Sequence, residues 1–169
     1  MDHVEAIWGC EFIEEVCENG RRISELGYTI DNTSKTRAIF EINKGVPQNP
    51  QIDVNSKMAE SVRRVRFENM IYVADGPSDI PAFSLLEARG GSTFAIHPKG
   101  DRKAMRQVEQ MRMDGRIHMF AEADYSEGTT ASMWIENKIL EFAERIYEQE
   151  RSHLAASISD APRHLTTGV

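Results

Sequence analysis

Two aspartates follow a short apolar run in the middle of the chain. Residues 70–74 carry no charge, and Asp75 and Asp79 come directly after them, separated by the turn formers Gly76, Pro77 and Ser78. Such a run is typical of a strand that is buried on both faces of a parallel sheet. Open parallel sheets bind ligands at the carboxyl ends of their strands, and Mg²⁺ prefers carboxylate oxygens. The pair therefore predicts half of a magnesium site.

A plainer interpretation of the two acids stays open. A helix is expected to begin near Asp79, since Pro81 is tolerated in a first helical turn. The helix is expected to end before Gly90. Asp79 would then serve only as the residue that caps this helix, and Asp75 would be an acid of the turn. The position of both acids at the carboxyl end of a strand favours the metal site.

Lys35 is the third candidate, at the start of a helix predicted for residues 34–43. A cation in the first turn of a helix opposes the macrodipole, whose positive end lies there. A bound phosphate would offset this repulsion, because the helix N-terminus offers free N–H donors and the lysine adds a full positive charge. We therefore expect Thr33, Ser34 and Lys35 to contact a phosphate. The alternative is a solvated lysine on a surface helix.

These segments resemble two motifs of the haloacid dehalogenase-like (HAD) hydrolases. Residues 70–79 are similar to motif IV, in which an apolar strand precedes Gly-Asp-x-x-x-Asp, although Ala74 stands where Gly is usual. Residues 32–40 look like motif III, which places a lysine at the start of a helix. The resemblance extends over residues 7–142, with a short hairpin insert at 17–28. It implies a partial Rossmann-like, three-layer α/β core with a parallel sheet.

The resemblance also implies an activity and roles for these residues. Asp75 and Asp79 would hold Mg²⁺ as the cofactor, and Lys35 would be the catalytic lysine that contacts the phosphate of a small-molecule substrate, together with Thr33 and Ser34. The family's aspartate nucleophile, in an Asp-x-Asp motif, has no counterpart in this chain. We therefore expect the carboxyl-terminal part of a Mg²⁺-dependent phosphohydrolase, a fragment inactive alone. The alternative is a non-catalytic HAD-like remnant that acts as a protein interaction module.

The missing part has a structural consequence. In the family, the strand that carries the two acids lies next to the nucleophile strand, so residues 70–74 would present an unpaired edge here. An unpaired edge is a template for pairing with another chain. We therefore expect either a complementing chain or a homo-oligomer.

Charge and hydropathy argue against nucleic acid and membranes as partners. The net charge of −7 argues against nucleic-acid binding, for which a concentrated basic face is expected. No apolar run approaches the roughly 20 residues that span a membrane, and the amino terminus lacks a signal-peptide core. A cytoplasmic location without membrane attachment follows as the prediction.

Beyond Lys35, strands and helices are predicted to alternate, which indicates a parallel sheet with right-handed crossovers. We expect one incomplete domain over residues 1–150 and a mobile or disordered tail over 151–169, which is rich in Ser, Ala and Thr. In the helix that Asp101 can cap, Met105, Val108 and Met111 are expected to point inward. The last helix, near residues 129–150, is expected to pack a stripe on the core, although the stripe could also bind a partner helix. The stripe comprises Ile135, Ile139, Phe142 and Ile146.

Overall fold

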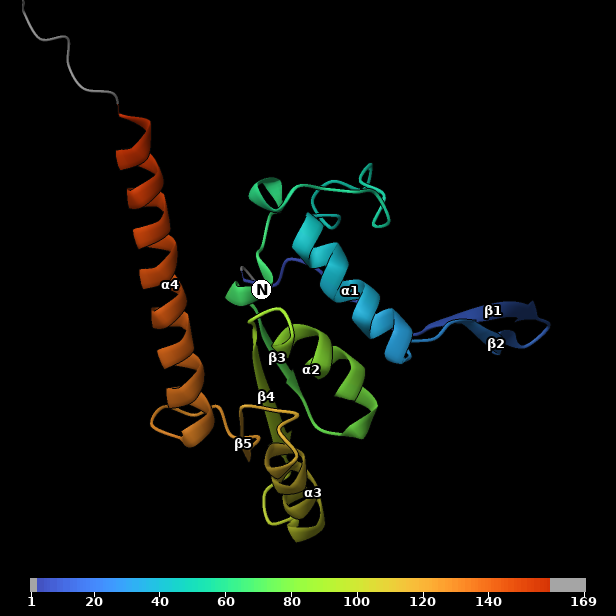
Figure 1. Ribbon diagram of the computed structural model, residues 1–169. Coiled ribbons are helices and arrows are strands. Elements are labelled where there is room, and N and C mark those ends of the chain that lie inside the picture. Colours follow the sequence, from blue (N-terminus) through green and yellow to red (C-terminus); the bar gives the residue numbers. More distant parts are fainter. Residues whose placement is uncertain (1–2, 159–169) are drawn as a thin grey trace, which may run out of the picture.

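The computed structural model describes residues 3–158 and has a mixed α/β fold. Figure 1 shows an antiparallel hairpin that stands apart from a body built of a parallel sheet and four helices. The strands are β1 (Glu11–Cys17), β2 (Gly20–Tyr28), β3 (Ile71–Ala74), β4 (Ser92–His97) and β5 (Met119–Glu122). The helices are α1 (Asn32–Lys44), α2 (Ile80–Glu87), α3 (Arg102–Met113) and α4 (Thr130–Ser157), with short 3-10 turns η1 (Glu60–Val62), η2 (Phe67–Asn69) and η3 (Pro77–Asp79).

The sheet is parallel and has the order β3-β4-β5. Val73 pairs with Phe94, and Ala95 pairs with Phe120, so β4 lies in the centre. Phe94 and Ala95 are fully buried on opposite faces, which is why β4 reads as a continuous apolar run. The predicted parallel sheet with alternating helices is confirmed.

Helices cover both faces of this sheet. On one face α2 and α3 contribute Phe83, Val108 and Met111 to a buried cluster around Ala95. On the other face α4 packs on β4, where the Trp134 ring stacks on Phe94 with centroids 4.8 Å apart. The inward positions predicted for Val108 and Met111 are confirmed. The prediction for Met105 is wrong, because 42% of its side chain is exposed near the start of α3.

Helix α1 starts and ends at recognisable caps. The Asp31 carboxylate accepts a hydrogen bond from the Ser34 backbone N–H, and Gly45 ends the helix with φ at 79°. This left-handed conformation suits glycine and lets its N–H bond the last carbonyls of the helix. Helix α1 packs against α2, where Ile39, Phe67 and Leu86 form a second buried cluster. The caps and this packing fix the first turn of α1 relative to the start of α2.

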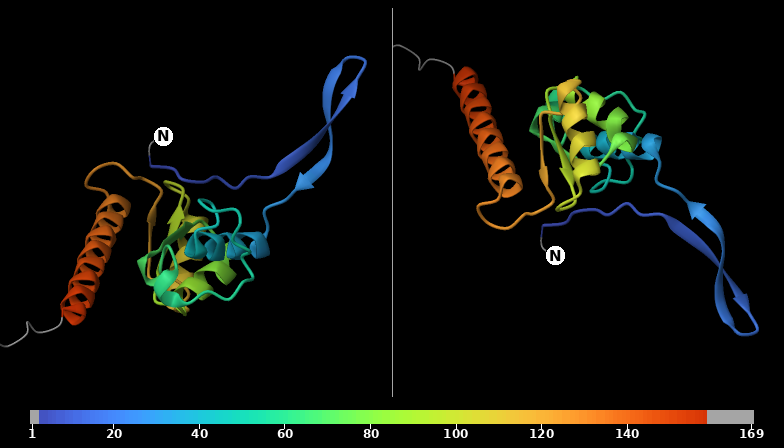
Figure 2. Two further views of the ribbon diagram at one scale, coloured as in Figure 1. Left: turned by 90° about the horizontal axis from the view of Figure 1, so that it is seen from above. Right: turned by 90° about the horizontal axis from the view of Figure 1, so that it is seen from below.

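The hairpin of β1 and β2 projects from the body in all three views (Figures 1 and 2). Every residue of both strands is exposed. The sequence predicts a hairpin at 17–28, whereas the two strands of the observed hairpin extend from Glu11 to Tyr28. The hairpin is therefore longer than expected and contributes little to the core.

Helix α4 is longer than expected and packs differently. Ile135 and Phe142 are partly buried, but Ile139 and Ile146 are 55% and 43% exposed, so the predicted core stripe is wrong for these two. Residues 151–157 of the expected tail belong to the helix, and residues 159–169 lie outside the described part of the chain. No helix within residues 3–158 is both long enough and apolar enough to cross a lipid bilayer.

Strand β3 forms one edge of the sheet. Its only partner among the described strands is β4, so its other side offers unpaired backbone groups. The four residues are each partly buried by neighbouring side chains. The predicted edge at residues 70–74 is thus present in the part of the chain that the structure describes.

Candidate functional site

Lys35 and Asp79 meet next to the carboxyl end of β3. The Lys35 Nζ atom lies 2.9 Å from Asp79 Oδ1 and 3.4 Å from Ser78 Oγ. Lys35 comes from the first turn of α1, and Asp79 is the last residue of η3, just before α2. Packing of α1 on α2 therefore brings together two residues that the sequence predicts on one site. Since its ammonium is ion-paired, Lys35 is not a free surface lysine.

The Asp79 carboxylate is buried and held from three directions. Its side chain is only 3% exposed. Oδ1 also accepts a hydrogen bond from the Tyr72 hydroxyl at 2.6 Å, and Oδ2 accepts one from Ser78 Oγ at 3.1 Å. Burial alone would raise the pKa of Asp79, but the bonds from Tyr72, Lys35 and Ser78 outweigh it and lower the pKa below the ordinary 3.8. Asp79 is therefore an ionised, buried carboxylate at neutral pH.

This geometry excludes the capping interpretation of Asp79. The residue stands at the N-cap position of α2, but its side chain makes no capping hydrogen bond to the helix. Its oxygens instead accept from Tyr72, Ser78 and Lys35. An N-cap role for the carboxylate is thus contradicted. The same ion pair supplies the negative charge that offsets a cation in the first turn of α1.

Tyr72 is a member of this cluster that the sequence-based reasoning missed. Its ring packs edge-on against Phe83, and burial raises the pKa of its hydroxyl, with a further rise from the bond to Asp79. The hydroxyl is therefore a firm hydrogen-bond donor at any pH near neutral. A tyrosine inside an apolar strand is itself a signal, because a buried phenol needs a polar partner.

Asp75 has different surroundings from Asp79. It is exposed, one residue beyond the end of β3, and its side chain makes no hydrogen bond or ion pair with any residue in 3–158. Its carboxylate oxygens are therefore free to bind a ligand from solvent. Across the described residues, no group of three or more His, Cys, Asp or Glu side chains gathers as a complete metal cage. Asp75 is the acid of the pair with open oxygens, because both oxygens of Asp79 already accept hydrogen bonds.

Ser34 and Thr33 make no hydrogen bond with Asp79. The Ser34 hydroxyl accepts from the Asp31 backbone N–H at 2.6 Å and donates to the Asp31 carbonyl, which completes a capping box at the start of α1. The sequence-based reasoning missed Asp31, although an Asp three residues before a Ser is a recognisable cap. Thr33 lines a separate cavity, which Lys35 does not line.

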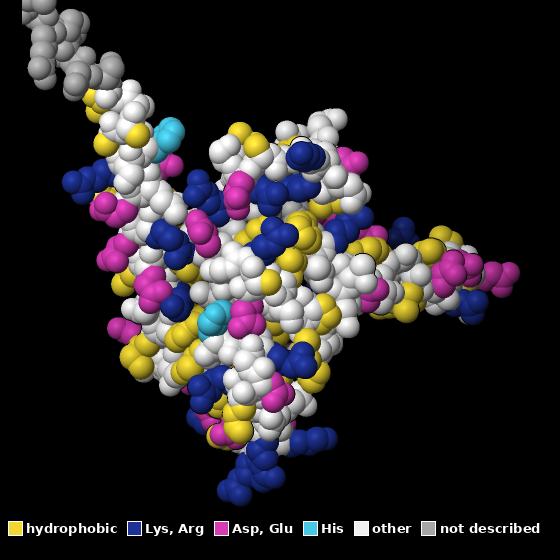
Figure 3. Space-filling model, in the orientation of Figure 1, with side chains coloured by type: hydrophobic (Ala, Val, Ile, Leu, Met, Phe, Trp, Pro, Cys, Tyr) yellow, Lys and Arg dark blue, Asp and Glu magenta, His cyan; other side chains and the backbone are white. Residues whose placement is uncertain are grey.

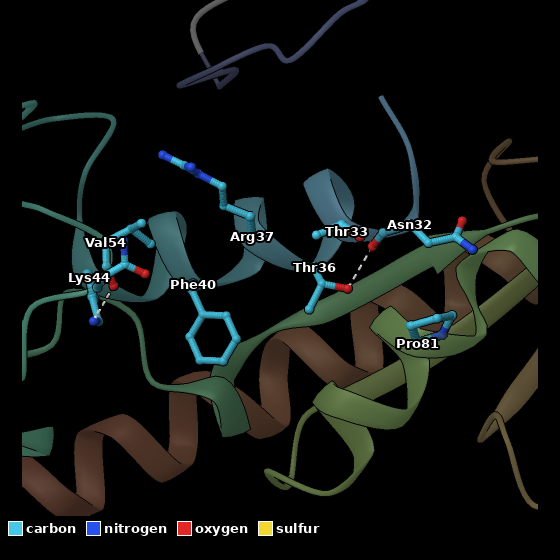
Figure 4. A pocket seen from close by; sticks show the side chains of 9 residues that line it. Asn32, Thr33, Thr36, Arg37, Phe40, Lys44, Val54 and Pro81 are labelled. Atoms are coloured by element: carbon cyan, nitrogen blue, oxygen red, sulfur yellow. Dashed lines mark hydrogen bonds between the residues drawn. The ribbon is translucent and has the colours of Figure 1, made fainter. Parts of the chain in front are cut away.

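Figure 4 shows that cavity, an open hollow of about 570 Å³ beside α1. Phe40 and Pro81 form its apolar side, and the Thr36 hydroxyl donates to the Asn32 carbonyl. The Lys44 ammonium is already used, because it donates to the carbonyls of Val54 and Ser56. The cavity therefore offers space near Thr33 but no free lysine.

A smaller cavity of about 230 Å³ adjoins the ion pair itself. Lys35 and Tyr72 line it at one side, and the remaining wall is mainly apolar. The wall residues are Trp8, Tyr28, Ile30, Ser34, Ala38, Ile39 and Ile42. The arrangement can therefore place an apolar group next to a lysine and a tyrosine hydroxyl.

Comparison with known proteins does not name a function. No family model matches the chain, and no solved structure matches it. An uncharacterized protein of Borreliella burgdorferi is 33% identical over 151 residues, which cover 81% of this chain and 50% of that protein. The chain thus spans about half the length of this curated relative.

Proposed function

We propose that this chain is the part of a Mg²⁺-dependent, HAD-type phosphohydrolase that carries the metal-binding and lysine motifs. The contact between Lys35 Nζ and Asp79 Oδ1 carries the proposal, because it joins the two segments that resemble motifs III and IV. The contact lies beside the carboxyl end of a parallel strand, where α/β sheets bind their ligands. The substrate class would be a phosphorylated small molecule.

In this proposal each residue has a distinct task. Asp75, with its open carboxylate, would hold Mg²⁺ directly, and Asp79 would hold it through water, because both of its oxygens already accept hydrogen bonds. When bound, Mg²⁺ neutralises phosphoryl oxygens and orients them for attack. Asp79 positions the Lys35 ammonium, which would bind the phosphate and stabilise the charge that develops on it.

The chain itself lacks the nucleophile of such a reaction. An Asp-x-Asp segment is absent from its sequence, so the attacking carboxylate and the acid–base residue would come from another polypeptide segment. The free edge of β3 is where a further strand could pair. The proposal therefore includes a complementing chain that supplies the nucleophile, and no turnover by the chain alone. A homo-oligomer could cover the edge of β3 but would lack the same nucleophile. A cytoplasmic location is also part of the proposal.

A second candidate is a non-catalytic interaction module. It is favoured by the closed state of the cluster, in which Tyr72, Ser78 and Lys35 satisfy Asp79 without any ligand. In that case the polar cluster would only join α1 to α2 and β3. The two candidates differ in whether Asp75 binds a cation.

A Mg²⁺ titration followed by amide NMR shifts separates them. Weak binding at millimolar Mg²⁺ is expected in the wild-type chain, with shifts centred on residues 75–79. The shifts should be lost in Asp75→Asn and kept in Asp114→Asn, an exposed acid at the end of α3. Identical shifts in wild type and Asp75→Asn would refute the metal site.

An activity assay tests the expected inactivity. The pure chain should release no phosphate from p-nitrophenyl phosphate above the buffer rate. Measurable release that Asp75→Ala abolishes would show that the chain holds a complete active site, contrary to the proposal.

A further inference from the structure

Helix α4 carries an apolar stripe on the side that faces away from the sheet. Met133, Leu140, Tyr147 and Leu154 follow one another at intervals of seven residues, and each is more than half exposed, at 54%, 63%, 65% and 63%. A seven-residue interval returns to nearly the same side of an α-helix, so the four side chains form one line. We call this line the outer stripe of α4.

The opposite face of α4 is firmly attached to the body. Trp134 stacks on Phe94, and the Arg145 guanidinium donates to the Glu68 carbonyl and to Asn69 Oδ1 at 2.9 Å. Gln149 also donates to Glu68 Oε1. The helix therefore cannot roll to bury its outer stripe without breaking these contacts. Figures 1 and 2 show α4 along one flank of the body, with no other element over its outer side.

The outer stripe is bordered by negative charge. Glu136 and Glu150 each lie three residues after a member of the stripe, and Glu144 is exposed on the other flank. Figure 3 shows acidic side chains along α4. The basic residues of the helix are engaged: Lys138 pairs with Glu141, Arg151 pairs with Glu148, and Arg145 points to the body.

The charge pattern disfavours a second copy as the occupant. Residues three after each stripe member complete the contact seam of a helix pair, so Glu136 and Glu150 would enter the interface of a symmetric dimer. Two such seams would bring carboxylates together in a partly desolvated place, and each chain carries a net charge of −7. A partner with basic residues at these places would gain from the same acids.

We infer that the outer stripe of α4 is a docking surface for a basic amphipathic helix of another protein. The partner helix would place an apolar side chain at every seventh residue, opposite the stripe. Lys or Arg side chains would lie opposite Glu136 and Glu150, which are about 21 Å apart along a helix at 1.5 Å per residue. This surface is independent of the proposed phosphohydrolase site, because no residue of the outer stripe lines the cavity beside Lys35.

Two labelled 28-residue peptides test the inference by fluorescence anisotropy. Both carry Leu at every seventh position; one has Lys on both flanks of the stripe, and the other has Glu at the same places. The Lys peptide should bind the full chain at least tenfold more tightly than the Glu peptide. The preference should weaken as salt is raised from 50 to 500 mM, because rim charges are screened. Equal affinities, or no binding of the Lys peptide, would overturn the inference.

Variants of the chain locate the site. The double variant Leu140→Ser, Leu154→Ser should bind the Lys peptide at least tenfold more weakly than the wild-type chain does. The double variant Glu136→Gln, Glu150→Gln should show a smaller preference for the Lys peptide over the Glu peptide. Val16→Ser, an 84% exposed apolar residue of the hairpin, is the matched control and should change nothing. An equal loss in Val16→Ser, or a stripe-dependent dimer in sedimentation that Leu140→Ser abolishes, would overturn the basic-helix partner. Circular dichroism checks that each variant keeps its helix content.

Discussion

Tyr72, Ser78, Asp79 and Lys35 form the polar cluster, and its order depends on the Tyr72 hydroxyl. It donates at 2.6 Å to a carboxylate that is almost fully buried, and hydrogen bonds to charged groups are stronger than neutral ones. Tyr72→Phe should therefore lower the free energy of unfolding by roughly 1–3 kcal/mol. Urea denaturation measures it. Tyr125→Phe, 52% exposed in the loop before α4, should stay within about 0.5 kcal/mol of wild type.

The same cluster predicts how stability changes with acid. Because the pKa of Asp79 is lower in the folded chain than its ordinary value, the ionised carboxylate stabilises the fold above about pH 4. That contribution is lost as the pH falls through the lowered pKa of the folded state. Asp79→Asn cannot titrate, so the stability difference between wild type and variant should shrink between pH 5 and pH 2.5. A difference that stays constant over this range, in urea melts at each pH, would contradict the lowered pKa.

At the scale of elements, Gly91 controls the tight connection from α2 to β4. A Cβ atom at this position would meet the Leu86 side chain and would lie 2.6 Å from the Phe67 carbonyl oxygen. The backbone carbonyl cannot swing aside, since Phe67 itself is buried. Gly91→Ala should therefore cost roughly 1–3 kcal/mol of unfolding free energy in urea. Gly9→Ala, where a Cβ meets nothing within 4 Å, is the control and should cost at most about 0.5 kcal/mol.

The elements also show where reasoning from sequence succeeds and where it stops. The apolar runs around Val73 and Phe94 identify buried parallel strands, and Lys35 and Asp79 were predicted on one site and are in contact. Periodicity does not say which side of a helix faces the sheet. For that reason the predicted stripe includes Ile139 and Ile146, although Trp134 and Arg145 are the residues that attach α4.

Tyr72 is absent from the sequence-based prediction for a similar reason. A strand alternates its side chains between two faces, so Tyr72 could be assigned to a face only after the neighbour on that face was known. Its partner Asp79 comes from the turn that follows the strand, and no spacing rule links a strand residue to a turn carboxylate. Ser34 alone fits both a cap and a phosphate contact, and only its spacing from Asp31 points to the cap.

At the scale of the whole molecule, local stability should be uneven. All residues of the β1–β2 hairpin are exposed, and a two-stranded hairpin alone is only marginally stable in water. Strand β4, in contrast, is paired on both sides and buried under helices on both faces. The hairpin amides should therefore exchange with solvent through local opening, whereas the β4 amides should exchange only through global unfolding.

Hydrogen exchange followed by mass spectrometry checks this gradient. Peptides from residues 11–28 should exchange within seconds at neutral pH, and peptides from residues 92–97 should be the slowest in the chain. Urea below the unfolding transition distinguishes the two modes, because it accelerates exchange strongly only where much surface becomes exposed. The β4 amides should respond to urea with the slope of global unfolding and the hairpin amides hardly at all. Protection of the hairpin equal to that of β4 would mean that its exposed apolar side chains, Phe12, Val16, Ile23 and Leu26, are covered in solution by another surface.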